Sequence, residues 1–367
     1  AQYVQQARDL SELLATCPNV DLLWQSKSRS GEPLRASAWI QRLQSALKHL
    51  NPWQVTELKF EPFMGQSAPI EMAVSTPDKD LAIPVTVSPS AYKTLRDCPY
   101  RYYVSSLLGL RKAKEFEEGF DASLAGQTLH ALLKTFFQSL KTEEEKLHSP
   151  IHKGVEIRRQ WMIDHLMSCS EKEFERLIAG DARVLGTLRD WQKQIPSFID
   201  WQLQRELDGW QYFDGELKVG FDLPFKDVDG NLNFIRIEGF ADRFDVQADN
   251  NQVASVLDYK NQRFEKVKLR AEHILDDPQL LIYARAANEG QENHKLSGHQ
   301  VQQAEWVALK ADISKGEEKA LRGQEVVDMP MMMQQFSEQI TADVEQLWAK
   351  KPMQAFAPEG VCQYCEA

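Results

Sequence analysis

The spacing of hydrophobic residues changes once along this 367-residue chain, from helical spacing to strand spacing near Glu216. Before that point, apolar side chains recur every three or four positions, which is typical of helices that bury one face. From Leu217 to Leu223 they alternate with other residues, as in half-buried strands. The chain is therefore predicted to lead with helices and to build its sheet in the second half.

Helical and linker patterns fill the first half of the chain. Residues 1 to about 50 are predicted to be helical, and residues 51–84, which hold five prolines, to form a linker or a wrapping loop. Ser88-Pro89 begins a helix, because serine caps helix starts and proline suits the first helical position. Another helix is predicted from about Asp121 to Leu140, and several more are inserted between about 142 and 210.

The strands are predicted from alternation and from turn signals. The first, from about Glu216, is joined through the Asp229-Gly230 turn to a second at about 233–246. A third strand then covers 253–260, a helix covers 278–287, and a fourth strand covers 304–309. This order predicts an α/β fold in which helices flank a small mixed sheet, with a large helical insertion before it.

Composition narrows the class of protein without deciding its function. The length favours one large domain with additions, or two domains, and no apolar run approaches the roughly 20 residues of a membrane span. A formal net charge of −11 counts against a non-specific nucleic-acid binder, but not against an enzyme whose carboxylates hold a metal. The basic residues of 96–114 and 260–270 either line a phosphate track or form solvated helix faces.

Two acidic residues on neighbouring predicted strands carry the strongest chemical signal. Asp242 lies in the second strand and Asp258 ends the third, so antiparallel pairing brings their side chains close together. Two such carboxylates repel each other unless a cation such as Mg²⁺ neutralises them. Lys260 follows Asp258 by two residues and faces the same side of the sheet. A metal and an ammonium side by side suit phosphodiester hydrolysis, although Asp-x-Lys alone is common at strand ends.

The motifs around these residues resemble the PD-(D/E)xK nuclease superfamily, in particular its RecB-like branch. The segment 239–245 (GFADRFD) matches the strand with the metal-binding Asp, and Asp258-Tyr259-Lys260 matches the Asp-Tyr-Lys that follows. Gln279 and Tyr283 match a Gln-xxx-Tyr helix, and His130 matches the His of an upstream Gly-xxx-His helix. One departure is Asn261-Gln262, where relatives often have a small residue and Gly.

The resemblance implies a restriction-endonuclease-like core and a set of site residues. His130, Asp242 and Asp258 would hold Mg²⁺ or Mn²⁺, with the Tyr259 carbonyl as a candidate fourth ligand. Lys260 would position the attacking water, and Gln279 and Tyr283 would position DNA or the lysine. The candidate DNA contacts are Arg101, Arg243 and Arg263.

A second part of the resemblance concerns the cysteines. Cys98, Cys362 and Cys365 match three of the four ligands of an iron–sulfur cluster in some RecB-like nucleases. The resemblance therefore implies a [4Fe-4S] cluster in a longer protein. The fourth cysteine would lie beyond residue 367, so the sequence is a fragment, or the cluster has been lost, or the resemblance fails at this point.

The resemblance also implies a biological setting. Residues 1–84 are expected to be the remnant of a helicase-like region, as in AddB-like proteins, and residues 85–367 a RecB-like nuclease domain. The expected role is exonucleolytic processing of single- or double-stranded DNA ends in repair, in the bacterial cytoplasm near the nucleoid, alongside a helicase subunit or helicase-like region. The alternatives are a non-catalytic DNA-binding module of the same fold, a CRISPR-associated RecB-like nuclease, and a helical protein with chance motifs.

Overall fold

The structure is a computed structural model. It describes residues 2–17, 20, 22, 33–35, 37–46, 76–78, 80–110, 122–289, 294–296, 298–310 and 322–355. The chain divides into two compact units, residues 1–71 and 72–367. The first contains helices α1 (Gln2–Thr16) and α2 (Ala38–Ala46). None of the described helices is both long and apolar enough to cross a membrane.

The second unit is built on a mixed sheet of six described strands, which confirms the expected fold class. Strands β2 (Trp210–Lys226), β3 (Leu232–Gln247) and β4 (Val253–Arg263) form an antiparallel meander. Strand β5 (Gln300–Lys310) lies parallel to β4. The crossover between β4 and β5 consists of α8 (Phe264–Glu272) and α9 (Gln279–Glu289). Two short strands complete the sheet: β1 (Thr86–Val87) pairs with β3, and β6 (Gly323–Glu325) pairs with β5.

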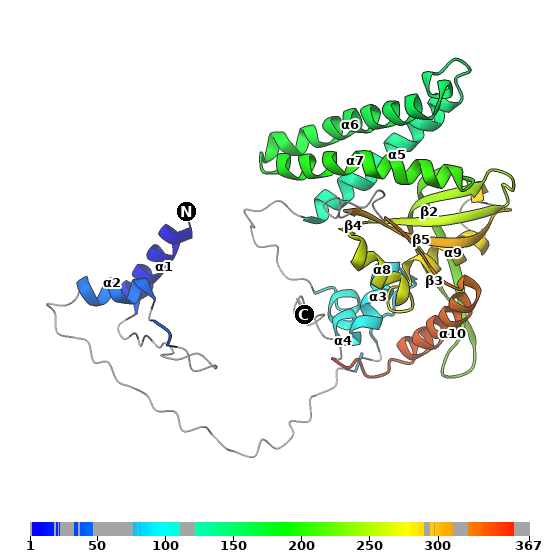
Figure 1. Cartoon of the computed structure of the whole chain (residues 1–367). Coiled ribbons are helices and arrows are strands. Elements are labelled where there is room, and N and C mark those ends of the chain that lie inside the picture. Colours follow the sequence, from blue (N-terminus) through cyan, green and yellow to red (C-terminus); the bar gives the residue numbers. More distant parts are fainter. Residues whose placement is uncertain are drawn as a thin grey trace. The chain divides into compact units, whose positions relative to one another are not determined.

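Helices cover both faces of the sheet (Figure 1). Alternate residues of β4 point to opposite sides, so Val256 packs with α8, α9 and α10 (Met329–Trp348), whereas Leu257 packs with the other layer. That other layer holds α5 (Ala122–Glu144), α6 (Val155–Gly180) and α7 (Val184–Leu207). The predicted helical insertion is therefore the long α6–α7 hairpin.

A short helical segment at the start of the second unit packs against the sheet. Helix α3 (Pro89–Asp97) begins as expected, because the Ser88 hydroxyl accepts a hydrogen bond from the Ala91 amide at 3.2 Å. Helix α4 (Pro99–Tyr102) and a π-helical turn at Tyr103–Leu107 follow. Gly239 of β3 gives Pro89 room, since a Cβ there would lie 2.9 Å from the proline Cδ. This contact explains the glycine of the 239–245 motif.

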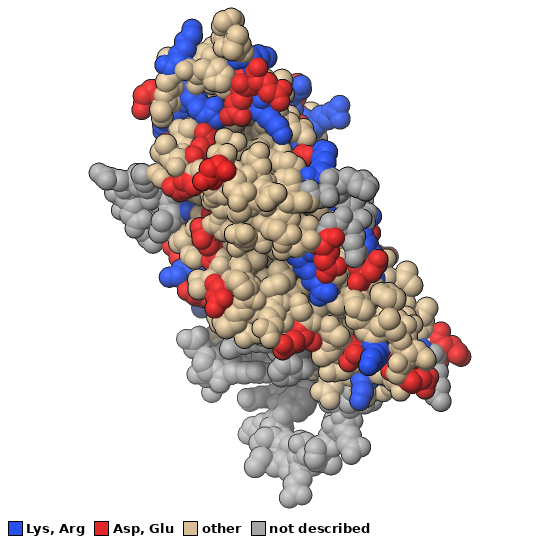
Figure 2. Space-filling view, turned by 90° about the vertical axis from the view of Figure 1, so that its right-hand side faces the viewer, with Lys and Arg blue, Asp and Glu red and all other residues tan. Residues whose placement is uncertain are grey.

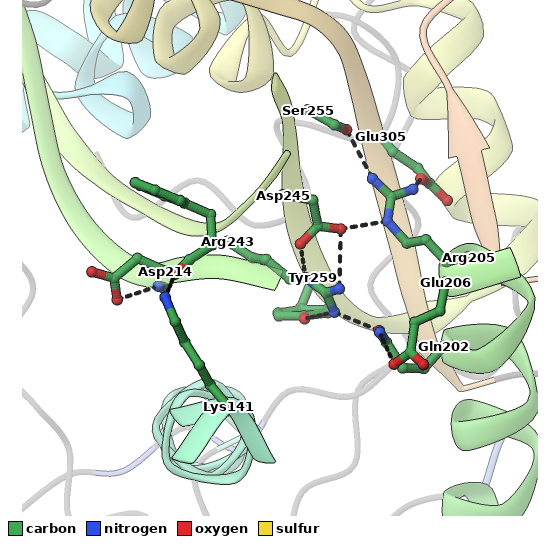
Figure 3. A network of polar contacts seen from close by, with 12 residues as sticks. Lys141, Gln202, Arg205, Glu206, Asp214, Arg243, Asp245, Ser255, Tyr259 and Glu305 are labelled. Carbon is green, nitrogen blue, oxygen red and sulfur yellow. Dashed lines mark hydrogen bonds and ion pairs between the residues drawn. The ribbon is translucent and has the colours of Figure 1, made fainter. Parts of the chain in front are cut away.

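A buried polar network fastens α7 to the sheet (Figure 3). Arg205 of α7, which is 6% exposed, contacts Asp245 of β3 at 2.5 Å and also pairs with Glu305 of β5. Its third nitrogen donates to the Ser255 hydroxyl at 2.9 Å. Arg243 donates to the same Asp245 at 2.6 Å. Because each charge has a partner, the hairpin is held in one position by contacts that would be costly to break singly.

Most expected elements are present, with shifted ends. Helix α5 continues to Glu144, and β2 begins at Trp210, before the onset of clear alternation. The elements β1, β6, α8 and α10 were not predicted. Most of the expected linker at 51–84 lies outside the described residues.

Candidate active site

The central feature of the site is a fork between β3 and β4. The two strands pair from Val246 and Ala254 to Arg243 and Leu257. Beyond that point β3 continues along β2 and β1, whereas β4 continues along β5. The next residues, Asp242 and Asp258, therefore lie where the strands separate. Groups from both faces of the sheet can meet in this opening.

Three side chains converge on one side of the fork. Ligand atoms of His130, Glu216 and Asp242 all lie within 4.8 Å of one another. The Nδ1 atom of His130, on α5, is 3.2 Å from Asp242 Oδ1 and 3.9 Å from Glu216 Oε1. Glu216 lies between residues paired with Arg243 and Ala241, so it stands opposite Asp242 on β2. One nitrogen and two carboxylates at these separations can share a divalent cation.

The backbone of Tyr259 holds two of these side chains in place. Its amide donates to Asp242 Oδ2 at 2.7 Å, and its carbonyl oxygen lies 3.1 Å from His130 Nε2. A carbonyl only accepts, so Nε2 of His130 carries a proton and donates it to this oxygen, while Nδ1 faces the carboxylates. The Tyr259 hydroxyl in turn accepts from Arg243 at 3.2 Å. One residue thus links the metal-binding side of the fork to the buried network.

Asp258 is a buried carboxylate with a single close partner. It is 1% exposed, and apart from Lys260 its oxygens have no polar partner among the described residues. Its one close contact is with the Lys260 ammonium, whose Nζ lies 2.6 Å from Oδ2 in ionic contact. Burial, followed by the charge of Asp242, raises the pKa of Asp258 to about 7. The single ammonium therefore does not offset burial and the charge of Asp242, and a further cation would favour the charged carboxylate.

Lys260 of β4 lies on the side of the sheet that α9 covers. Its Nζ donates to Gln279 Oε1 at 3.0 Å, and Gln279 Nε2 donates to the Tyr283 hydroxyl at 2.8 Å. The ammonium also lies 4.7 Å from the centre of the buried Trp306 ring, within the range of a cation–π contact. Gln279 and Tyr283 are one helical turn apart on α9, so the helix presents both to the lysine. These contacts fix the position of the amine beside Asp258.

The residues present fit a divalent cation. Burial opposes a charge on His130, but the hydrogen bond that its ring donates to Asp242 and the charges of Asp242, Asp258 and Glu216 outweigh it and raise the pKa to about 9. Burial and then Asp242 raise the pKa of Glu216. Without a cation, the cluster therefore tends to hold protons. A metal would replace them, and the oxygen-rich set with one imidazole suits Mg²⁺ or Mn²⁺.

Asp258 lies next to the three-residue cluster but does not belong to it. The sequence predicted His130, Asp242 and Asp258 as the ligand set, whereas the grouped ligand atoms come from His130, Glu216 and Asp242. Glu216 was missed. Counting equal steps back from the Asp229-Gly230 turn places position 216 or 217 opposite Asp242, and this register was the available signal.

The expectation that Arg243 contacts DNA is wrong. Its side chain is 1% exposed, and its guanidinium is hydrogen-bonded to Asp245, Gln202 and Tyr259 beneath α7 (Figure 3). Alternation along β3 turns it to the face that the helical insertion covers. The other two candidates lie at the surface, with Arg101 half-buried on α4 and Arg263 exposed at the end of β4.

Of the three cysteines proposed to bind an iron–sulfur cluster, the structure describes one. Cys98 is buried, with 6% of its surface exposed, between α3 and α4. Cys362 and Cys365 lie outside the described residues. The iron–sulfur cluster therefore stays a prediction.

The sequence was compared with models of protein families and with curated proteins. The model of the PD-(D/E)XK nuclease superfamily matches residues 86–367, which include every residue of the fork. No curated protein matches the chain significantly.

Proposed function

The chain belongs to the PD-(D/E)XK nuclease superfamily, and on that premise we propose that it hydrolyses phosphodiester bonds of DNA with Mg²⁺ or Mn²⁺. The observation that carries the proposal is the buried carboxylate of Asp258, whose only described polar partner is the Lys260 ammonium at 2.6 Å and whose pKa the charge of Asp242 helps to raise. A structural carboxylate at this depth would be hydrogen-bonded. A carboxylate that waits for a cation explains the arrangement.

In this proposal His130, Glu216 and Asp242 hold the cation, and Asp258 completes its surroundings from β4. The bound cation would supply Lewis acidity toward a phosphate oxygen and toward water. Lys260 would orient the attacking water and stabilise the charge that develops on the phosphate. Gln279 keeps the amine directed at that position through the hydrogen bond of 3.0 Å. Tyr259 keeps Asp242 and His130 directed at the same point through its backbone.

We further propose the finer role that the resemblance implies, namely exonucleolytic processing of DNA ends in repair beside a helicase or helicase-like region. An iron–sulfur cluster is part of that proposal. In support of it, the amide of Tyr100 donates to the carbonyl of Gln354 at 3.2 Å. This bond holds the chain eight residues before Cys362 next to the segment that begins with Cys98. Anaerobic purification of the chain extended beyond residue 367, followed by visible absorption, tests the cluster.

The test of the main proposal is degradation of linear DNA with Mg²⁺ and with EDTA. Asp258→Ala and Lys260→Ala are expected to abolish Mg²⁺-dependent cleavage while the circular dichroism spectrum is kept. Asp249→Ala, between β3 and β4, and Lys226→Ala, at the end of β2, make the same chemical changes at exposed positions and should cleave normally. Full activity of either fork variant, or cleavage by the wild type in EDTA, would refute the assignment.

A further inference from the structure

Next to the fork lies a pocket that the proposed chemistry does not use. It has a volume of about 350 Å³, within the usual range for ligand sites, and lies between α7 and the ends of β4 and β5. Asn261, which follows Lys260, and Leu129, which precedes His130, both line it. The pocket is therefore adjacent in the chain to residues on both sides of the fork.

Two cations stand side by side at the mouth of this pocket. Arg263 and Lys310 pair directly in the register of the parallel strands β4 and β5, at their carboxyl ends, and both are exposed. Neither makes an ion pair with any described residue. Like charges placed opposite each other on adjacent strands are unfavourable. The arrangement is stabilised when an anion lies between them.

The other charged side chains of the pocket nearly cancel. Lys193 and Asp190, on α7, form an ion pair at 3.1 Å, with more than 70% of each side chain exposed. That pair leaves Arg263 and Lys310 as the uncompensated charges among the lining residues that the structure describes. The pocket therefore has a net positive character, in a chain whose overall charge is −11.

A third cation lies behind the wall of the pocket. Arg322 is 1% exposed, yet its guanidinium bonds only to neutral acceptors among the described residues, including the Leu309 carbonyl at 3.1 Å and Gln194 Oε1 at 2.9 Å. Its Nε has no partner. Leu309 and Gln194 both line the pocket, so the buried charge is hydrogen-bonded directly to two residues of its wall. Burial lowers the pKa of Arg322 to about 10, which still leaves it charged at neutral pH.

We propose that this pocket binds a backbone phosphate of the nucleic-acid strand whose neighbouring phosphodiester lies in the fork. The proposal rests on the proposed function, because it takes the strand to be the substrate. Arg263 and Lys310 contact the phosphate directly, and Arg322 adds charge from behind the wall. On the face of the molecule in Figure 2, basic and acidic groups are interspersed. That face therefore has no broad basic surface to attract a nucleic acid, and a small site with two adjacent cations would bind a phosphate better.

The test is binding of a short fluorescent single-stranded DNA in EDTA, measured by anisotropy over a range of salt concentrations. The double variant Arg263→Gln/Lys310→Gln is expected to bind at least about tenfold more weakly. The slope of log K against log salt should fall in magnitude by about 0.7, because the pocket neutralises one phosphate and each phosphate neutralised on a single strand contributes about 0.7. The control Lys153→Gln/Lys226→Gln removes two exposed charges elsewhere and should keep the affinity and slope of the wild type.

Equal affinity of the two double variants would overturn the pocket assignment. Binding of inorganic phosphate that depends on Arg263 and Lys310 but does not compete with the DNA at matched ionic strength would assign the pocket to free phosphate and overturn its assignment to a strand. Because EDTA prevents cleavage, the result is separate from the nuclease test. A chain that fails to cut but shows the expected binding loss refutes the proposed function alone, and one that cuts but binds equally in both variants refutes the pocket alone.

Discussion

The buried carboxylate of Asp258, paired only with Lys260 among the described residues, predicts that the metal-free protein is destabilised by its own active site. Asp258→Asn removes the charge and keeps the shape of the side chain. Without metal at pH 8, the variant should be more stable than the wild type, although it should not cleave DNA. An increase in stability from a substitution in the core of the sheet would be unusual, because most core changes destabilise.

The magnitude follows from the position of the pKa. Burial and the charge of Asp242 raise the pKa of Asp258 from 3.8 to about 7, and a difference of that size corresponds to about 4 kcal/mol at pH values above both. Asparagine still buries an amide without a partner, at a cost of about 1–3 kcal/mol. The net gain in the free energy of unfolding should therefore be about 1–3 kcal/mol. In a domain of this size that corresponds to a rise in Tm of roughly 2–8 °C.

The sign of the pH dependence is also fixed. Because the folded protein keeps a proton on Asp258 that the unfolded chain has released, this group makes stability fall as the pH rises from about 4 to about 7. The contribution should be absent from Asp258→Asn. Mn²⁺ should then stabilise the wild type at pH 8, since a ligand that binds only the folded state raises its stability, and should stabilise the variant much less.

Thermal unfolding in EDTA across this pH range, repeated with Mn²⁺, measures all three effects. Asp249→Asn at the exposed turn serves as the control and should follow the wild type. A variant at position 258 that is less stable than the wild type in EDTA at pH 8 would refute the view that this carboxylate is held ready for a cation.

Three further substitutions test the surroundings of the fork. Tyr259→Phe removes the acceptor of the Arg243 hydrogen bond at 3.2 Å and should cost about 1–3 kcal/mol in urea denaturation, and an unchanged free energy of unfolding would contradict the network. Asp245→Asn leaves the buried Arg205 and Arg243 without their shared partner and should cost about 3–5 kcal/mol in the same measurement, whereas a loss below about 1 kcal/mol would show that the pairs contribute little. Glu216→Gln should reduce cleavage at limiting Mg²⁺ and recover with excess metal, and an unaltered metal dependence would exclude Glu216 as a ligand.

Local patterns in the sequence predicted much of the fold and part of the site. Alternation and the Asp229-Gly230 turn specified the β2–β3 hairpin, since these signals depend only on neighbouring residues. The spacing of Asp258 and Lys260 placed them on one face, where the structure has them in contact. Glu216 was missed because its relation to Asp242 depends on the cross-strand register, and its backbone at φ 53 departs from regular strand geometry.

The remaining features depend on tertiary packing that a single sequence does not encode locally. Arg243 lies within an acidic motif and was assigned to DNA, but the helical insertion covers its face of the sheet. Likewise, Arg322 follows β5 by twelve residues, and only the fold places it against Gln194 of α7. To predict the partners of such a buried charge, one must know how several helices and strands are placed relative to one another.

The most direct test of the account is Mn²⁺ binding, followed by electron paramagnetic resonance, in the wild type and in Asp242→Asn. The account predicts one saturable site in the wild type that is lost in the variant, because Asp242 joins His130 and Glu216 in the only three-residue cluster of metal-ligating side chains found among the described residues. Equal binding by both proteins, or no saturable binding by the wild type, would contradict it.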